Sequence, residues 1–456
     1  MRYNKRKLKA NRNKILPIKF VKQSITSYSG LQLFKYYMEI IGFYARLKKS
    51  FNNLSFSGDY SIVDLIIIMV FMKIVGIERL SHLAFIRNDP LFIRVSGLTK
   101  IPHRTTFIKA LKQFTSDALK VLIELNGELV MEKIRALGLK NLTIDLDGTV
   151  LSTKGHAAFA VKGYNPKKKG ANSYFPLTAH VAETGHFISI INRAGNNHDS
   201  NRALSIIKSI MAKTVGCIIR FRADSAFCTP EILDFLLNKS IGFAIKAPFW
   251  KLKHLKTSVQ ERKRWYHLNK IWSFYWIEDP IESCKYSHFG LILRKKVKEP
   301  SKEFQLDLFS PNNGYYEYSC IVTNNKDWNE EELFDFMSGR SAQENSISEL
   351  KSDFYFDHLL GNSYQANSAN LQIIQMAYNL MISMQIDVGL APKKNNKNKK
   401  TTRKYLCMKM KTLRFLIIYK AGKIVYDNGC KVLKLTANKS TEELYNKVQT
   451  NLGKAA

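Results

Sequence analysis

The chain of 456 residues contains few acids, no long apolar run and no closely spaced pair of cysteines. Only 37 Asp and Glu stand against 71 Lys and Arg, which gives a net charge of +34. The longest apolar run near the N-terminus, 65–72, falls short of the roughly 20 residues that a membrane-spanning helix needs. The six cysteines form no Cys-x-x-Cys motif, so the spacing of a zinc site is lacking and reduced thiols are expected.

The N-terminus also lacks the apolar core of a signal peptide, although residues 1–22 hold nine Lys or Arg. Together with the missing membrane span, this predicts a cytoplasmic protein. Because 45% of the residues are hydrophobic, the chain can bury a large core, and its positive charge then predicts a polyanionic partner. Nucleic acid is favoured over a membrane surface, since the sequence offers no amphipathic anchor and no lipidation motif.

Hydrophobic periodicity divides the chain into segments with different predicted structure. Apolar residues recur at helical spacing up to residue 138, and the pattern then changes to short strands that alternate with helices. We predict a basic arm at 1–22, a helical DNA-binding domain at 23–138, an α/β core at 139–249 and 325–388, a β-rich insertion at 250–324 and a basic C-terminal region at 389–456.

The order of elements within 139–249 indicates the fold of the core. Three strands are followed by a helix, a strand, a helix and a strand, which is the order of a ribonuclease H-like sheet. The predicted fold class is therefore α/β, with a ribonuclease H-like core, a β-rich insertion and an all-helical N-terminal domain. The insertion holds four of the five tryptophans; packing in a β core is their favoured use, and stacking on bases is the alternative.

Three basic segments are candidates for contact with DNA. The segment "IPHRTTFIKALKQF" predicts a short helix that would offer Arg104 and Lys109 to DNA phosphates, as the recognition helix of a helix-turn-helix motif does. The alternative is a plain surface helix. Residues 391–424 contain no acid and predict a mobile linker or a DNA-tracking tail, with a solvated charge run as the plain alternative. The lysines of the turn "NPKKKG" either contact DNA or only keep an exposed turn solvated. These are Lys167, Lys168 and Lys169.

Two predicted strands each deliver a carboxylate to their C-terminal end. In "TIDLDGTVLS" polar residues alternate with apolar ones, which places Asp145 and Asp147 on one face. A sheet face open to water is the plain explanation of such a strand. The strand in "GCIIRFRADS" carries Asp224 at its C-terminal end, and because the two strands are neighbours in the predicted sheet, Asp147 and Asp224 should converge. Two like charges this close repel, and a divalent cation is the usual remedy.

A predicted helix in "GRSAQENSISELK" supplies a third acid between two cations. Arg340, Glu344 and Lys351 are spaced by four and seven residues, so they form one stripe on the helix surface. Taken alone, the stripe is typical of an exposed ion-pair face. Beside two strand-end aspartates in a strongly basic protein, it indicates a metal-binding carboxylate flanked by cations that hold phosphates.

The segments "DLDGT", "RADSAF" and "GRSAQENSISELK" resemble the three acidic motifs of DDE transposases from bacterial insertion sequences. The resemblance is to the subgroup with a β insertion before the third acid, whose third motif contains Arg-x3-Glu-x6-Lys. The two intervals between Asp147, Asp224 and Glu344 are 77 and 120 residues, which leaves room for the insertion. Met337 occupies the slot where the subgroup has tyrosine.

The resemblance implies a two-metal site for DNA cleavage and strand transfer, formed by Asp147, Asp224 and Glu344. It implies two Mg²⁺ ions, which Mn²⁺ could replace, and it gives Arg340 and Lys351 a phosphate-binding role. The implied partners are double-stranded DNA, as transposon ends and target, and a second copy of the chain in a synaptic homodimer. The implied location is the bacterial cytoplasm, at the nucleoid.

Asp147 is preferred over Asp145 as the metal ligand, because Asp147 directly precedes Gly-Thr at the strand end. Asp145 then becomes a secondary residue on the same face. Two alternatives remain: a structure-specific nuclease of ribonuclease H-like fold would share the acids without joining ends, and a host-adapted DNA-binding protein would be expected to lose at least one acid.

Overall fold

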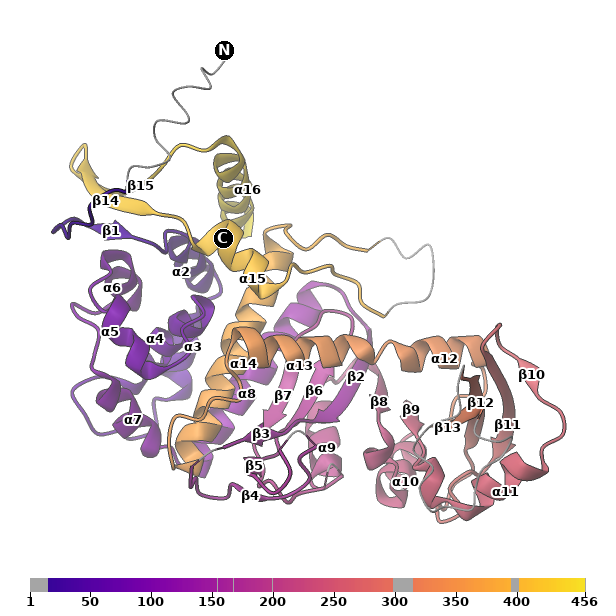
Figure 1. Ribbon diagram of the computed structural model, residues 1–456. Helices are drawn as coiled ribbons and strands as arrows, with labels where there is room; N and C mark the ends of the chain where they lie inside the picture. The colour runs from indigo at the N-terminus through magenta and orange to yellow at the C-terminus, as the bar shows by residue number, and fades with distance from the viewer. Residues whose placement is uncertain are drawn as a thin grey trace.

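A large mixed sheet organises the protein, as seen in a computed structural model (Figure 1). The residues that the structure describes are 15–153, 155–166, 168–198, 200–297, 315–394 and 402–455. Within these ranges the sheet contains nine strands in the order β10-β11-β12-β13-β9-β8-β2-β6-β7. Its core strands are β2 (Asn141–Gly148), β6 (Leu177–Val181), β7 (Phe187–Ile191), β8 (Ile218–Ala223) and β9 (Gly242–Lys246).

The predicted order of strands and helices in the core is confirmed. After β2, β6 and β7 the chain forms α9 (Ala203–Lys213), returns as β8, forms α10 (Pro230–Asn238) and returns again as β9. Strand β2 lies in the middle, antiparallel to β6 and parallel to β8. This arrangement brings the C-terminal ends of β2 and β8 to the same edge of the sheet.

The insertion extends the same sheet. Its strand β13 (Tyr316–Thr323) pairs antiparallel with β9, and the other insertion strands follow outward. They are β12 (Phe289–Lys296), β11 (Trp272–Glu278) and β10 (Tyr266–His267), with α11 (Lys253–Glu261) before them. Trp265 and Trp272 pack against aromatic neighbours as favoured, whereas Trp250 and Trp276 are 53% and 37% exposed.

Different helices cover the two faces of the sheet. Apolar residues of α9, α10 and α11 share one buried cluster with Ile144 and Leu146 of β2. On the other face lie α12 (Glu330–Ser338) and α13 (Ser341–Asp353), which run nearly end to end across the strands in Figure 1. The polar face of β2, which carries Asp145 and Asp147, is therefore turned toward α13.

The N-terminal region is helical, as predicted. Its helices share one buried apolar cluster with α14 (Tyr364–Asp387), a long helix that also contacts β7. The N-terminal helices are α2 (Leu31–Ile40), α3 (Phe43–Ser50), α4 (Ile62–Ile74), α5 (Leu83–Ile86), α6 (Pro90–Ser96), α7 (Arg104–Lys112) and α8 (Ser116–Ala136). The helical region and the sheet are thus joined through a common core.

The C-terminal region returns to the start of the chain. Strand β14 (Gly422–Asp427) pairs with β1 (Ile25–Thr26) and with β15 (Cys430–Leu435), and α16 (Lys439–Ala455) contacts α2. Figure 1 shows these yellow elements beside the indigo N-terminal ones.

Residues 402–418 lie against the core. The backbone N–H of Met408 donates to Gln385 Oε1 at 2.7 Å, and that of Met410 donates to Glu349 Oε1 at 2.7 Å. Helix α15 (Met410–Leu413) follows, and the side chain of Met410 is completely buried.

Arg414 fastens this segment to the N-terminal helices. Its guanidinium is 4% exposed and donates to the carbonyl oxygens of Ile74 and Lys73, each at 2.8 Å, which satisfies acceptors at the C-terminal end of α4. The prediction of a mobile linker is therefore wrong for 402–414, and contact of this segment with DNA stays a prediction. The part of the predicted linker at 395–401 lies outside the described residues.

Candidate active site

The ends of β2 and β8 bring two of the predicted acids to one place. These parallel strands are in register from Asn141 opposite Ile218 to Leu146 opposite Ala223. The next residue on each strand is the predicted acid, Asp147 and Asp224. Asp147 is only 18% exposed at its side chain, and Asp224 caps the short helix after β8 by accepting from Ala226 N at 3.0 Å. The predicted convergence of these strand ends follows from this register.

Helix α13 adds the third acid through an arginine. Arg340, at the start of α13, lies 3.5 Å from Asp147 Oδ2 through Nη1, and its Nη2 donates to Glu344 Oε1 at 3.1 Å. The arginine side chain is 13% exposed, whereas that of Glu344 is 60% exposed and open to a ligand. Lys351 Nζ donates to Val150 O at 3.1 Å, just beyond the end of β2. The predicted stripe thus faces the strand end that carries Asp147.

The donor chemistry suits a hard divalent cation, because carboxylate oxygens are the ligands that Mg²⁺ prefers. In this arrangement the Arg340 guanidinium lies between Asp147 and Glu344 and balances their charge. No group of three or more His, Cys, Asp or Glu among the described residues is gathered tightly enough to hold a metal. Asp147, Asp224 and Glu344 thus fit a metal site by residue type, and the first two also by strand register. In the structure the cation that Asp147 and Glu344 contact is Arg340.

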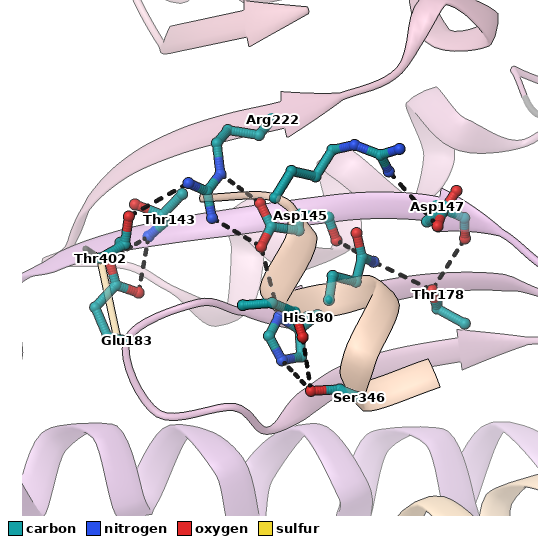
Figure 2. Close-up of polar contacts among 12 residues, drawn as sticks. Thr143, Asp145, Asp147, Thr178, His180, Glu183, Arg222, Ser346 and Thr402 are labelled. Atoms are coloured by element: carbon teal, nitrogen blue, oxygen red, sulfur yellow. Dashed lines mark hydrogen bonds and ion pairs between the residues drawn. The ribbon is translucent and has the colours of Figure 1, made fainter. Parts of the chain in front are cut away.

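Asp145 has a different environment from Asp147. Its carboxylate is fully buried and accepts from Arg222 Nε at 2.5 Å and from Arg222 Nη2 at 2.9 Å. His180 Nδ1 lies 3.5 Å away, but burial lowers the pKa of that ring, so Arg222 is the counter-ion (Figure 2). The expectation of a sheet face open to water is wrong here, because α13 covers this part of β2. Asp145 is a buried partner of an ion pair.

Arg222 and Gln343 take part in this arrangement, and sequence reasoning did not single them out. Arg222 stands two residues before Asp224, hence on the same strand face, and directly opposite Asp145 in the register of β2 and β8. That alternation was a usable signal. Gln343 directly precedes Glu344 and is completely buried. Its sequence context is a predicted helix with many polar residues, and nothing in that pattern indicated that this one would be buried.

The candidate DNA contacts lie on other elements than the strands and the helix that carry the three acids. Arg104 and Lys109 are exposed on α7, which begins at Arg104 with His103 as its N-cap. Lys168 and Lys169 are exposed in the turn between β4 (Val161–Lys162) and β5 (Asn172–Tyr174), which pair as a hairpin. Lys167 lies outside the described residues.

Glu183 makes the free energy of unfolding depend on pH. It follows β6, and both of its carboxylate oxygens accept from Thr143 N, at 2.9 and 3.0 Å (Figure 2). Burial raises its pKa from 4.5 to about 7, so the folded protein keeps the proton where the unfolded chain has lost it. Stability from this group is therefore fully present below pH 4.5 and is lost as the pH rises to about 7.

We expect Glu183→Gln to raise the free energy of unfolding at pH 8 by on the order of 3 kcal/mol relative to the parent protein. The amide has no proton to lose and still accepts from Thr143 N. Urea unfolding of both proteins between pH 4.5 and 8 measures the difference, which should grow up to about pH 7 and then stay constant. A difference that does not change with pH would contradict the assignment.

No helix in the described ranges is long and apolar enough to cross a membrane.

Comparison with known proteins gives the chain a family. A solved structure that is similar to this chain is a cryo-EM structure of the piggyBac transposase synaptic complex with hairpin DNA; the identity is 10%, the match covers 95% of this chain and 88% of that chain, and the TM-score is 0.45. No curated protein matches the chain. The family described as "Transposase DDE domain group 1" matches residues 8–456. The chain belongs to this family of transposases, enzymes that cut transposon DNA ends and join them to new DNA.

Proposed function

We propose that this transposase binds the terminal inverted repeats of a bacterial insertion sequence, cleaves both ends and joins them to target DNA. The catalytic unit would be a ribonuclease H-like core. The observation that carries the proposal is the contact of Arg340 with both Asp147 and Glu344, at 3.5 and 3.1 Å, beside the strand end where Asp224 also arrives. Three acids and a phosphate-binding cation are what phosphodiester chemistry requires.

Asp147, Asp224 and Glu344 would hold two Mg²⁺ ions, for which Mn²⁺ could substitute. When bound, such ions activate the attacking oxygen and stabilise the leaving oxygen of an in-line displacement. In cleavage a water oxygen replaces a bridging oxygen at phosphorus. In strand transfer the freed 3′-hydroxyl does the same on the target strand.

Arg340 and Lys351 would hold the phosphates of the DNA. An arginine contacts a phosphate as a two-pronged fork, and a lysine acts as a point charge. Arg340 contacts the carboxylates of Asp147 and Glu344. Its transfer to a phosphate would release Asp147 and Glu344 for the cations and would couple DNA binding to assembly of the site.

Recognition of double-stranded ends would fall to the helical region and to exposed basic residues. These include Arg104 and Lys109 on α7 and Lys168 and Lys169 in the β4–β5 turn, and Lys167, which directly precedes Lys168 in the sequence, is proposed with them. Joining two ends requires two active sites close together, so a homodimer on DNA is proposed. An enzyme of this kind would act at the bacterial nucleoid.

Binding to the ends should weaken steeply with salt. The net charge of +34 favours many phosphate contacts, and each contact adds about 0.9 to the slope of log K against log salt. Fluorescence anisotropy with a labelled duplex, titrated at several NaCl concentrations, gives the slope. We expect more than about three contacts; a shallower slope would contradict predominantly electrostatic binding.

Strand transfer separates this proposal from a structure-specific nuclease. The substrate is a duplex from the DNA that flanks the gene, supplied with one end already cleaved to a 3′-hydroxyl. Joining of that end to a plasmid in Mg²⁺ supports the proposal. Hydrolysis without joining would favour the nuclease, and binding with neither reaction would favour a DNA-binding protein.

A further inference from the structure

A buried ion pair fixes the second acid-bearing strand to the first. Arg222 on β8 and Asp145 on β2 are both completely buried, and the guanidinium donates to the two carboxylate oxygens at 2.5 and 2.9 Å. In a dry interior a two-point contact of this kind resists both sliding and rotation of its partners. The predicted ligands Asp147 and Asp224 each stand two residues beyond a member of the pair.

The same arginine also holds the helices that carry the third acid. Its Nη1 donates to the carbonyl oxygen of Phe336 at 2.5 Å, in the last turn of α12, and to Thr402 Oγ1 at 3.3 Å. A Cβ added at Gly339 would lie 2.4 Å from Nη1. The absence of a side chain at Gly339 therefore lets Arg222 reach this helix end.

Gln343 ties α13 to β2 and β6. Its Nε2 donates to Asp145 O at 3.0 Å and to Thr178 Oγ1 at 3.3 Å, and Thr178 Oγ1 in turn donates to Asp147 O at 3.0 Å. Figure 2 shows Thr178 next to Asp147, its partner in the register of β2 and β6. The residue after Gln343 is Glu344, so this contact fixes the helix turn from which the third acid projects.

We propose that Asp145, Arg222 and Gln343 form a buried clamp that positions the three acids of the active site. Each clamp residue lies one or two positions before one acid: Asp145 before Asp147, Arg222 before Asp224, and Gln343 before Glu344. The clamp residues are fully buried and act as positioning residues. Groups that orient metal ligands are typically worth about 10-fold to 100-fold in metal affinity or rate. This inference rests on the proposed function of the three acids.

Gln343→Met tests the clamp with little change in packing. Methionine has a similar length, and no described residue donates to Gln343 Oε1, so the parent amide is only half satisfied. We expect the melting temperature to stay close to that of the parent protein. The rate of Mg²⁺-dependent nicking at saturating DNA should fall about 10-fold to 100-fold, and Mn²⁺ binding to the protein in complex with an end duplex, followed by electron paramagnetic resonance, should weaken similarly.

Gln375→Met is the matched control. Gln375 on α14 is also completely buried, donates to Phe187 O at 2.8 Å and has an Oε1 to which no described residue donates. It faces β7, which carries none of the three acids. A general effect of losing a buried amide would appear in both variants, whereas positioning predicts loss of rate and of Mn²⁺ affinity only in Gln343→Met.

Gly339→Ala provides a second route to the same conclusion, because its methyl group would displace the Arg222 guanidinium without altering any acid. It should lower the rate and the Mn²⁺ affinity as well. Normal values of both in folded Gln343→Met and Gly339→Ala would overturn the clamp. The proposed function itself fails if the parent protein does not nick DNA and Glu344→Gln binds Mn²⁺ as tightly as the parent protein. This result differs from failure of the clamp, because it concerns the acids and not the residues that position them.

Discussion

Asp147→Asn is expected to abolish DNA nicking and strand transfer while DNA binding is retained. The amide has the shape of the carboxylate but is a far poorer ligand for a hard cation. Asp147 lies 3.5 Å from Arg340, and this arginine also donates to Glu344 at 3.1 Å, so the cation keeps a carboxylate partner when the charge of Asp147 is lost and the fold should be retained. Mg²⁺-dependent nicking of an end-containing duplex, with anisotropy for binding, separates the two effects.

Glu344→Gln should have the same outcome, and Glu349→Gln is its matched control. Both glutamates lie on α13, about 140° apart around the helix. Glu349 accepts from Met410 N at 2.7 Å, and burial raises its pKa, so a neutral amide can take its place. Nicking that survives in Glu344→Gln and is lost in Glu349→Gln would move the third acid to Glu349.

Asp145→Asn is expected to act on stability. It would leave the Arg222 guanidinium buried without its counter-ion, and removal of one partner from a buried ion pair costs about 3–5 kcal/mol. Domains are stable by only about 5–15 kcal/mol, so this is a large fraction of the total. Urea unfolding should show the loss, and molecules that remain folded should keep some activity because Asp147 is intact.

A double variant tests the cause of that loss. Asp145→Leu combined with Arg222→Met replaces both charges with apolar groups, and such replacements of buried pairs are often neutral or stabilising. The double variant should therefore be more stable than Asp145→Asn alone, although it lacks the contact with Phe336 O. If Asp145→Asn unfolds at the same urea concentration as the parent protein, the pair does not have the buried character described above.

Local patterns in the sequence determined the order of elements and the set of acids. Alternation with period two marked β2 and β8, helical spacing marked α9 and α10, and these assignments agree with the structure because the periodicity follows from backbone geometry alone. Strand order then placed Asp147 beside Asp224. The spacing of Arg340 and Glu344 by four residues predicted their contact for the same reason.

Tertiary structure alone decided how Asp145 differs from Asp147. Both residues share a face of β2, and although the Gly-Thr after Asp147 favoured it as the metal ligand, no local pattern predicted that Asp145 would be buried in an ion pair. The difference comes from Arg222 and α13, which are remote in sequence and bury one carboxylate while the other keeps partial access to solvent. Burial and pairing are properties of the assembled fold, so they could not be predicted from the strand.

The C-terminal region shows that a prediction from composition has the same limit. A run of lysines without acids predicts a solvated segment, yet 402–418 packs on the core through residues such as Leu413 and Ile417. These apolar side chains become stabilising only because they join a buried cluster that also contains residues of α4 and α14, which are remote in sequence. The sequence by itself determined which carboxylates stand at the ends of the strands, and the folded chain determined which buried contacts surround them.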